Sequence, residues 1–186
     1  RRDVVVERLD AAGLLPAIVF IFSRAGCEAA VDQVLAAGTR LTTEAERREI
    51  ATILEPFSER IPAEDLHAVN YSAFASAALR GVASHHAGML PVFKEAVEAL
   101  FVRGLIKVVF ATETLALGIN MPARSVVIER LIKWDGREHA AVTPGQYTQL
   151  TGRAGRRGID VEGHAVVLYG SGVDPLAVAG LASRRT

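Results

Sequence analysis

The sequence predicts an α/β domain whose sheet is mainly parallel and is covered by helices on both faces. Continuous aliphatic runs alternate with stretches of helical spacing, and buried parallel strands produce such runs. The 186 residues suit one domain with a substantial core, and half of them are hydrophobic. No apolar run approaches the ~20 residues of a membrane span, so these residues are expected to build a core and no membrane partner is expected.

The strands are expected at five aliphatic segments, which are Ala17–Phe22, Gly81–Ser84, Lys107–Ala111, Ser125–Glu129 and His164–Tyr169. Helices should lie between them. One follows the first strand over Ala25–Ala36, and another covers Pro91–Arg103. The second has Pro91 in its first turn and Gly104 just past its end, which is the usual punctuation of a helix.

The segment from Gly38 to Arg80 interrupts this alternation, and we expect a helical insertion at the edge of the sheet at about 38–80. Thr42 or Thr43 could cap a charged helix that runs to about Leu54, where Pro56 and Pro62 should break it. A plain connection without a function is the alternative. The whole chain, 1–186, is then one domain.

A hairpin is expected over Leu131–His139, because the pair Asp135 and Gly136 favours the tight turns that join antiparallel strands. It would project beyond the sheet. Trp134 near its tip could stack on a nucleic-acid base or pack the hairpin against the domain, and the sequence leaves both open.

The charge balance restricts the kind of partner. Lys and Arg number 21 and Asp and Glu number 21, so a nucleic-acid surface must be a local groove. The single cysteine, Cys27, excludes an internal disulfide and a Cys-rich zinc motif, which fits a reducing compartment and makes the cytoplasm the expected location. The chain starts without Met, and we expect it to be part of a longer protein.

In sheets of this kind, ligands bind beyond the carboxyl ends of the strands, so binding residues are expected in the loops that follow strands. Ser23 and Arg24 follow the first strand near a helix start, where a hydroxyl and a guanidinium could meet a phosphate. A helix cap by Ser23 with a surface Arg24 explains the pair equally well.

Two longer strings follow later strands. Residues Thr112–Pro122 read TETLALGINMP, which offers small hydroxyls, a glycine turn and an amide to a phosphodiester backbone. Residues Gln149–Gly158 read QLTGRAGRRG, in which arginines lie among glycines that permit close approach of a phosphate.

The pair His85 and His86 ends another strand and raises the question of a metal site. We reject it, because adjacent strand residues point to opposite faces and no carboxylate or thiol joins them in a ligand spacing. No metal site is expected in this chain.

Taken together, the strings Leu15–Arg24, His85–Met89, Ala111–Pro122 and Gln149–Gly158 resemble the second RecA-like domain of superfamily-two helicases. Their order and spacing are similar to the DEVH-box branch of the superkiller-type RNA helicases, and within it to the HelY-like group. The resemblance covers nearly the whole chain and implies a three-layer fold of the P-loop NTPase type.

The resemblance implies a role for each matched residue. Arg153 and Arg156 would reach the γ-phosphate of ATP as arginine fingers, with Gln149 beside them. Gly118, Asn120 and Gly152 would lie on the nucleotide side. The nucleic-acid side would comprise Ser23, Arg24 and Thr112, with Trp134 on a hairpin that occupies the place of a strand-separating element.

The sequence lacks a glycine-rich phosphate cradle and an acidic Mg²⁺ motif, since the string Glu64–His67 follows no strand and lacks that motif's order. ATP and Mg²⁺ would be bound mainly by a first RecA-like domain of the same parent chain. We therefore expect the second motor domain of an ATP-dependent helicase that moves 3′ to 5′ on single-stranded or partly duplex RNA, and no ATP hydrolysis by this fragment alone. A DNA helicase of the repair type and a non-catalytic binding module are the alternatives.

Overall fold

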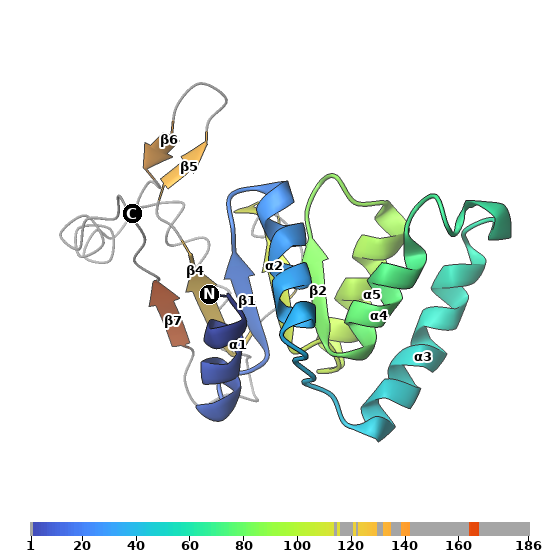
Figure 1. Ribbon diagram of the computed structural model, residues 1–186, viewed down its shortest axis with the longest axis horizontal. Coiled ribbons are helices and arrows are strands. Elements are labelled where there is room, and N and C mark those ends of the chain that lie inside the picture. Colours follow the sequence, from blue (N-terminus) through green and yellow to red (C-terminus); the bar gives the residue numbers. More distant parts are fainter. Residues whose placement is uncertain are drawn as a thin grey trace.

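A five-stranded parallel sheet forms the centre of the molecule (Figure 1). The computed structural model describes residues 2–113, 115, 121, 123–129, 132–134, 139–141 and 164–167. The strands of the sheet are β1 (Ala17–Phe20), β2 (Val82–His85), β3 (Val108–Ala111), β4 (Ser125–Ile128) and β7 (His164–Val167). Their spatial order is β2-β3-β1-β4-β7, so β1 is central and β2 is an edge strand. The predicted fold class is confirmed.

Helices lie on both faces of this sheet. The helices α1 (Arg2–Ala11) and α2 (Arg24–Ala36) share one buried cluster, whereas α5 (Pro91–Val102) contributes to the cluster on the other face. The predicted helices at 25–36 and 91–103 agree with α2 and α5 to within one residue at each end. The sequence analysis did not anticipate α1, which packs against α2.

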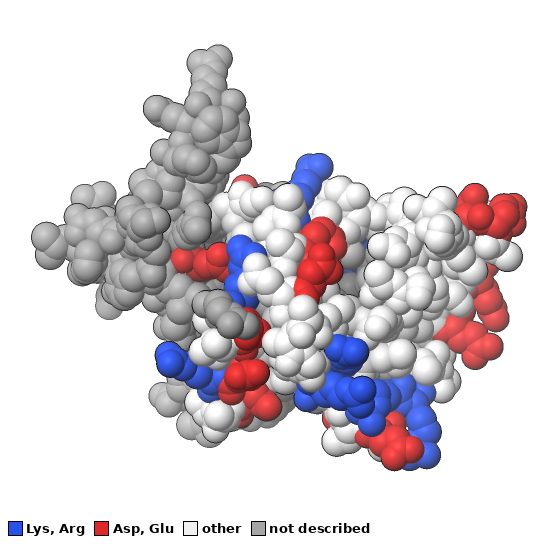
Figure 2. All heavy atoms as spheres, viewed as in Figure 1, with Lys and Arg blue, Asp and Glu red and all other residues white. Residues whose placement is uncertain are grey.

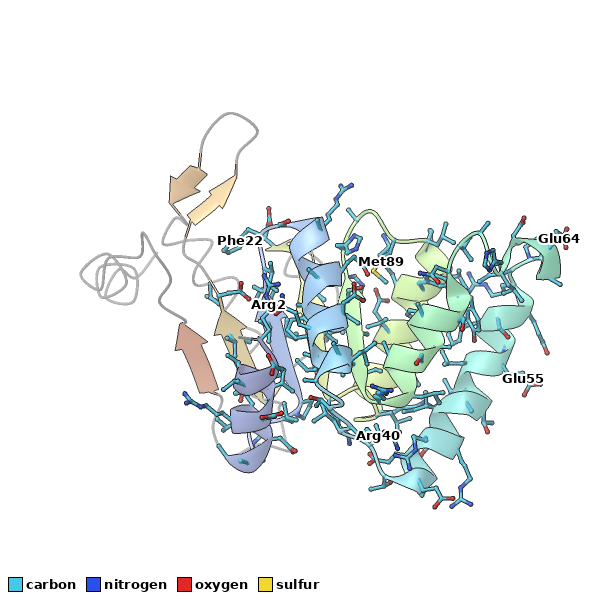
Figure 3. The ribbon with its side chains drawn as sticks, viewed as in Figure 1. Arg2, Phe22, Arg40, Glu55, Glu64 and Met89 are labelled. Atoms are coloured by element: carbon cyan, nitrogen blue, oxygen red, sulfur yellow. The ribbon has the colours of Figure 1, made fainter. Side chains whose placement is uncertain are left out.

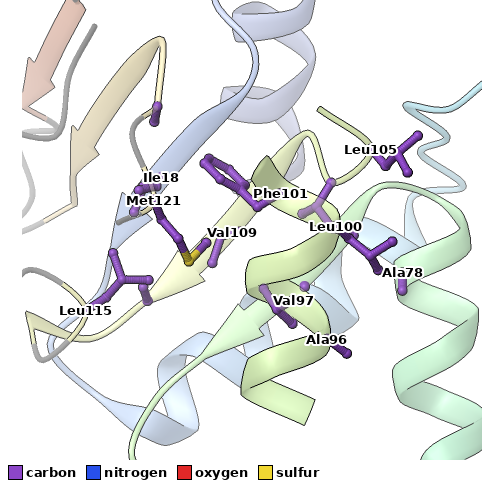
Figure 4. Packing of buried hydrophobic residues seen from close by; sticks show 14 of the residues in the cluster. Ile18, Ala78, Ala96, Val97, Leu100, Phe101, Leu105, Val109, Leu115 and Met121 are labelled. Carbon is purple, nitrogen blue, oxygen red and sulfur yellow. The ribbon is translucent and has the colours of Figure 1, made fainter. Parts of the chain in front are cut away.

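The two clusters divide the side chains of β1 by their alternation along the strand. Ile18 and Phe20 enter the cluster that α5 covers, while Ala17 and Val19 enter the cluster that α2 covers. Figure 4 shows Leu100 and Phe101 of α5 in the first cluster, with Ile18, Val109 and Met121. Because β1 is buried on both faces, its sequence reads as an uninterrupted apolar run.

The segment that precedes β2 contains α3 (Glu44–Glu59), the short 3-10 helix η1 (Ala63–Asp65) and α4 (Tyr71–Leu79). α4 lies next to β2, and α3 lies outside it (Figure 1). A capping box starts α3, with Thr43 and Glu46 each accepting a backbone N–H of the other.

The expected break of this helix at Pro56 is wrong. α3 continues through Pro56 to Glu59. Proline removes one hydrogen bond and strains the preceding turn, but the apolar residues around it compensate. Leu54 is buried, and Phe57 packs against the same cluster, so tertiary packing holds the last turn of the helix.

The predicted hairpin is present as β5 (Ile132–Trp134) and β6 (His139–Ala141), which pair antiparallel with Trp134 opposite His139. It extends away from the main sheet (Figure 1). None of the helices in the described part of the chain has the length and apolarity needed to span a bilayer.

Candidate functional site

The carboxyl ends of the parallel strands meet along one edge of the sheet. Phe20 pairs with Ala111 on one side and with Ile128 on the other, and Ala111 pairs with His85. The loops that start at Ile21, His86, Thr112 and Glu129 therefore leave from the same edge, and the hairpin lies beyond it (Figure 1). Open parallel sheets bind their ligands at this edge.

Ser23 and Arg24 lie in the loop after the central strand. Ser23 is extended, with φ −153° and ψ 128°, and its Oγ accepts the Gly26 N–H at 3.0 Å, so it caps α2. Among the described residues the hydroxyl proton of Ser23 has no acceptor, so it can be donated to a ligand. Arg24 is exposed, and its guanidinium has no hydrogen-bond or ion-pair partner among the described residues. Ser23 therefore caps α2 while the neighbouring Arg24 remains available to an anionic ligand.

Close packing beneath this loop fixes its shape. A Cβ on Gly26 would lie 2.8 Å from Cγ2 of Ile21, so no side chain fits there. Cys27 is fully buried and its thiol donates to the Ile21 carbonyl. Burial raises the pKa of Cys27 to about 12, so the thiol stays protonated at neutral pH and is no nucleophile.

Thr112 follows β3 and is far less accessible than Ser23. Its residue exposure is only 7%, its N–H donates to the His85 carbonyl at 3.3 Å, and its own carbonyl accepts from Leu115. Leu115 and Met121 are both fully buried in the α5-side cluster. These contacts anchor both ends of the 112–122 string in the core, beside the carboxyl edge.

His85 and His86 point to opposite faces, as the alternation of strand residues predicts. Nε2 of His85 lies 2.9 Å from Glu98 on α5, and Nε2 of His86 lies 2.7 Å from Glu28 on α2. The sequence analysis missed both carboxylates, because they are distant in sequence. Desolvation by burial lowers the pKa of His85, although Glu98 opposes the shift. The described residues contain no group of three metal-ligand side chains.

A second feature that the sequence analysis missed is an ion pair between α1 and the end of β4. Arg2 donates from Nε and Nη2 to the two carboxylate oxygens of Glu129, at 2.9 Å each. Both side chains are largely shielded from solvent, with exposures of 22% and 17%. Bidentate geometry of this kind fixes orientation as well as charge, so α1 is fastened to the carboxyl edge.

Charged side chains are distributed unevenly around the site. In Figure 3, Phe22 and Met89 mark the carboxyl edge. The charged residues Arg40 and Glu64 lie away from it, Arg40 at the opposite edge and Glu64 at the far end of the α3–η1 segment. Figure 2 shows acidic side chains over α2 and a group of basic ones near the start of α3. Glu64 and Asp65 are exposed in η1, away from the strand ends.

Several predicted site residues lie outside the described part of the chain. These are Gly118, Asn120, Gln149, Gly152, Arg153 and Arg156. Trp134 is described as part of β5 by its backbone alone. The structure thus brings Ser23, Arg24 and Thr112 to one edge of the sheet.

Comparison with known proteins identifies the family. Residues 57–158 match the helicase conserved C-terminal domain family, which covers more than half of the chain. The chain is 60% identical over its full length to the probable helicase HelY of Mycobacterium tuberculosis. It is 44% identical, over 89% of its length, to the DExH-box ATP-dependent RNA helicase DExH11 of Arabidopsis thaliana. It is 40% identical, over 94% of its length, to the antiviral helicase SKI2 of Saccharomyces cerevisiae.

The chain spans only a small part of these relatives, namely 20% of HelY, 12% of DExH11 and 13% of SKI2. The family match over residues 57–158 includes the strands β2, β3 and β4 and the strings His85–Met89, Ala111–Pro122 and Gln149–Gly158. The chain therefore belongs to the helicase C-terminal domain family, in the Ski2-type branch of the superfamily-two DExH-box helicases.

Proposed function

We propose that this chain is the second motor domain of an ATP-dependent RNA helicase that translocates 3′ to 5′ and works in the cytoplasm. The observation that carries the proposal is the common edge at which the loops after β1, β2 and β3 meet, with the Ser23 hydroxyl and the Arg24 guanidinium on it. A row of donors at such an edge suits the phosphodiester backbone of a single strand. The relatives named as RNA helicases support RNA as the substrate.

In this proposal the arginine string acts on ATP across a cleft between two domains. Arg153 and Arg156 stabilise the charge that develops on the γ-phosphate, and Gln149 couples the nucleotide state to closure. Gly118, Asn120 and Gly152 lie on the nucleotide side. ATP and Mg²⁺ are held mainly by a first RecA-like domain elsewhere in the longer protein. Guanidinium groups placed in this way contribute about 10³ to 10⁵ in turnover in related phosphoryl-transfer systems.

On the nucleic-acid side, Ser23, Arg24 and Thr112 contact the phosphodiester backbone. Ser23 retains a hydroxyl proton that it can donate, whereas the buried Thr112 contributes mainly through its position. Trp134 stacks on a base at the point where the hairpin meets the duplex.

The test is the ATPase activity of the full-length protein with single-stranded RNA, with single-stranded DNA and without nucleic acid. We expect stimulation by RNA, and a loss of about 10³-fold or more in the Arg156→Ala variant. Arg157→Ala is the matched control, because this neighbouring arginine has no assigned role, and it should retain most activity. Preferential stimulation by DNA would indicate a DNA helicase, and no turnover under any condition would indicate a binding module.

The isolated 186-residue chain provides a second test of the division of labour. It should show no steady ATP turnover, because the phosphate cradle and the Mg²⁺ ligands are assigned to the first domain. Sustained hydrolysis by the purified fragment would contradict the proposal.

A further inference from the structure

The loop after β2 is folded around the ring of His86. The Gly88 N–H donates to Nδ1 of His86 at 3.1 Å, and the Met89 N–H donates to the His86 carbonyl at 3.2 Å. His86 is almost fully buried, with a residue exposure of 7%. The position of its ring therefore determines the path of the loop.

These hydrogen bonds also determine the tautomer of His86. A nitrogen that accepts an N–H carries no proton, so Nδ1 is unprotonated and the proton of the neutral ring is on Nε2. Nε2 then donates to Oε1 of Glu28 at 2.7 Å. The hydroxyl of Ser84 donates to the same oxygen at 2.9 Å. Glu28, on α2, thus holds a ring that belongs to the loop after β2.

The same loop lies beside the stem of Arg24. A Cβ on Gly88 would lie 3.2 Å from the His86 ring and 3.4 Å from Cδ of Arg24, so Gly88 is a close neighbour of both side chains. The stem of Arg24 therefore lies next to a loop that His86 holds by the Gly88 hydrogen bond, while the guanidinium has no partner among the described residues.

We propose that His86, oriented by Glu28 and Ser84, is a positioning residue that holds the loop of residues 86–90 against Arg24 and so presents the Arg24 guanidinium to a phosphodiester group. This inference rests on the proposed function, since it assigns a purpose to Arg24 in nucleic-acid binding. His86 itself contacts no ligand. Its effect on binding passes through Gly88 and the stem of Arg24.

Two amide variants separate the two hydrogen bonds of the ring. His86→Asn places an oxygen near the position of Nδ1, so it can still accept the Gly88 N–H but cannot reach Glu28. His86→Gln places its amide nitrogen near the position of Nε2, so it can still donate to Glu28 but offers Gly88 no acceptor. If the inference holds, amide hydrogen exchange at Gly88 should be faster in His86→Gln than in His86→Asn.

The decisive measurement is the dissociation constant of the full-length protein for a fluorescent single-stranded oligouridine, in a double-mutant cycle. We expect His86→Ala and His86→Gln to weaken binding by about fivefold to tenfold, and His86→Asn by about twofold or less. In the Arg24→Ala background, His86→Ala should add almost no further loss. Asp32→Asn is the control, because Asp32 lines the same groove between α2 and α4 as Glu28 but makes no hydrogen bond to the loop within the described residues.

Two outcomes would overturn the inference. Additive losses of Arg24→Ala and His86→Ala, in a wild-type protein that binds the oligouridine, would show that His86 acts independently of Arg24. A loss in His86→Asn as large as in His86→Gln would show that the Gly88 hydrogen bond is not the connection. Failure of the wild-type protein to bind the oligouridine would instead overturn the proposed RNA-binding function as well.

Discussion

The two edges of the parallel sheet use their polar side chains differently. At the amino edge, polar side chains hold the backbone of neighbouring turns. Thr42 donates to the Leu79 carbonyl at 2.6 Å, Arg80 donates to the Leu35 carbonyl at 3.2 Å, and Lys107 donates to the Gly104 carbonyl at 2.7 Å. At the carboxyl edge, Arg24 has no such partner among the described residues, and Ser23 keeps a donor available.

This difference indicates a division of labour within one sheet. The amino edge contributes to folding stability, because Thr42, Arg80 and Lys107 donate to backbone acceptors of the same chain. At the carboxyl edge Arg2 is held by Glu129, whereas the Arg24 guanidinium in the loop after β1 has no such partner among the described residues and is available to a ligand. Three substitutions should break or sharpen this comparison.

The largest effect on stability is expected from Gly81→Ala at the amino edge. Gly81 has φ +80°, and a Cβ there would lie 3.0 Å from Cγ of Lys107 and 3.0 Å from Cγ2 of Thr42. Strain and crowding together should lower the free energy of unfolding by about 2–3 kcal/mol. Urea denaturation of the 186-residue chain measures the loss.

The matched control for this prediction is Gly104→Ala. Gly104 has a similar φ of +73°, but nothing lies within 4 Å of the position of its Cβ. In Gly104→Ala the free energy of unfolding should fall only by the cost of the left-handed backbone conformation, about 1–2 kcal/mol. Equal losses in the two variants would contradict the claim that the amino edge is tightly packed around Gly81.

A smaller, pH-dependent effect is expected from His85, whose pKa burial lowers from the usual 6.5. Below about pH 6.5 the unfolded chain takes up a proton at this histidine that the folded chain does not, so stability falls as the pH decreases. His85→Gln should flatten the dependence of the unfolding free energy on pH below about pH 6.5. Replacement of the exposed His67 by Gln is the control. An unchanged slope in His85→Gln would contradict the assignment.

The smallest effect on stability is expected from Arg24→Ala, within about 0.5 kcal/mol, because the side chain is exposed. Its effect should appear in binding instead. RNA affinity of the full-length protein should fall, and the slope of log K against log salt should decrease by about 0.7, the value for one phosphate contact on a single strand. Arg40→Ala at the opposite edge is the control, and an equal effect there would remove the distinction between the edges.

The fold was largely predictable from the sequence, because its strands are buried on both faces and read as continuous apolar runs. The loops that follow the strands could also be located, because each loop begins where an apolar run ends. The helix α1 was not predicted, because its buried positions, Asp3, Val6 and Leu9, form a short and partly polar stripe. The course of α3 through Pro56 depended on packing by Leu54 and Phe57, which local propensity does not contain.

The partners within the candidate site could not be predicted. Glu28 reaches His86 across 58 residues, and Arg2 reaches Glu129 across 127. Such pairs depend on the order of strands in the sheet, and a single sequence does not specify that order. The choice between a capping Ser23 and a ligand-binding Ser23 was likewise open, and the structure establishes the cap.

The buried thiol of Cys27 lies beneath the Ser23–Arg24 loop, so its chemical labelling can report local opening of the domain. Cys27 is the single cysteine in the chain, it is fully buried, and its pKa of about 12 suppresses the thiolate. A thiol-specific dye can therefore label it only when α2 separates from β1 or the domain unfolds. The labelling rate of Cys27 in the full-length protein, measured with and without RNA, would give the rate at which this loop opens. No cysteine has to be introduced for this measurement, but other cysteines of the longer protein have to be replaced.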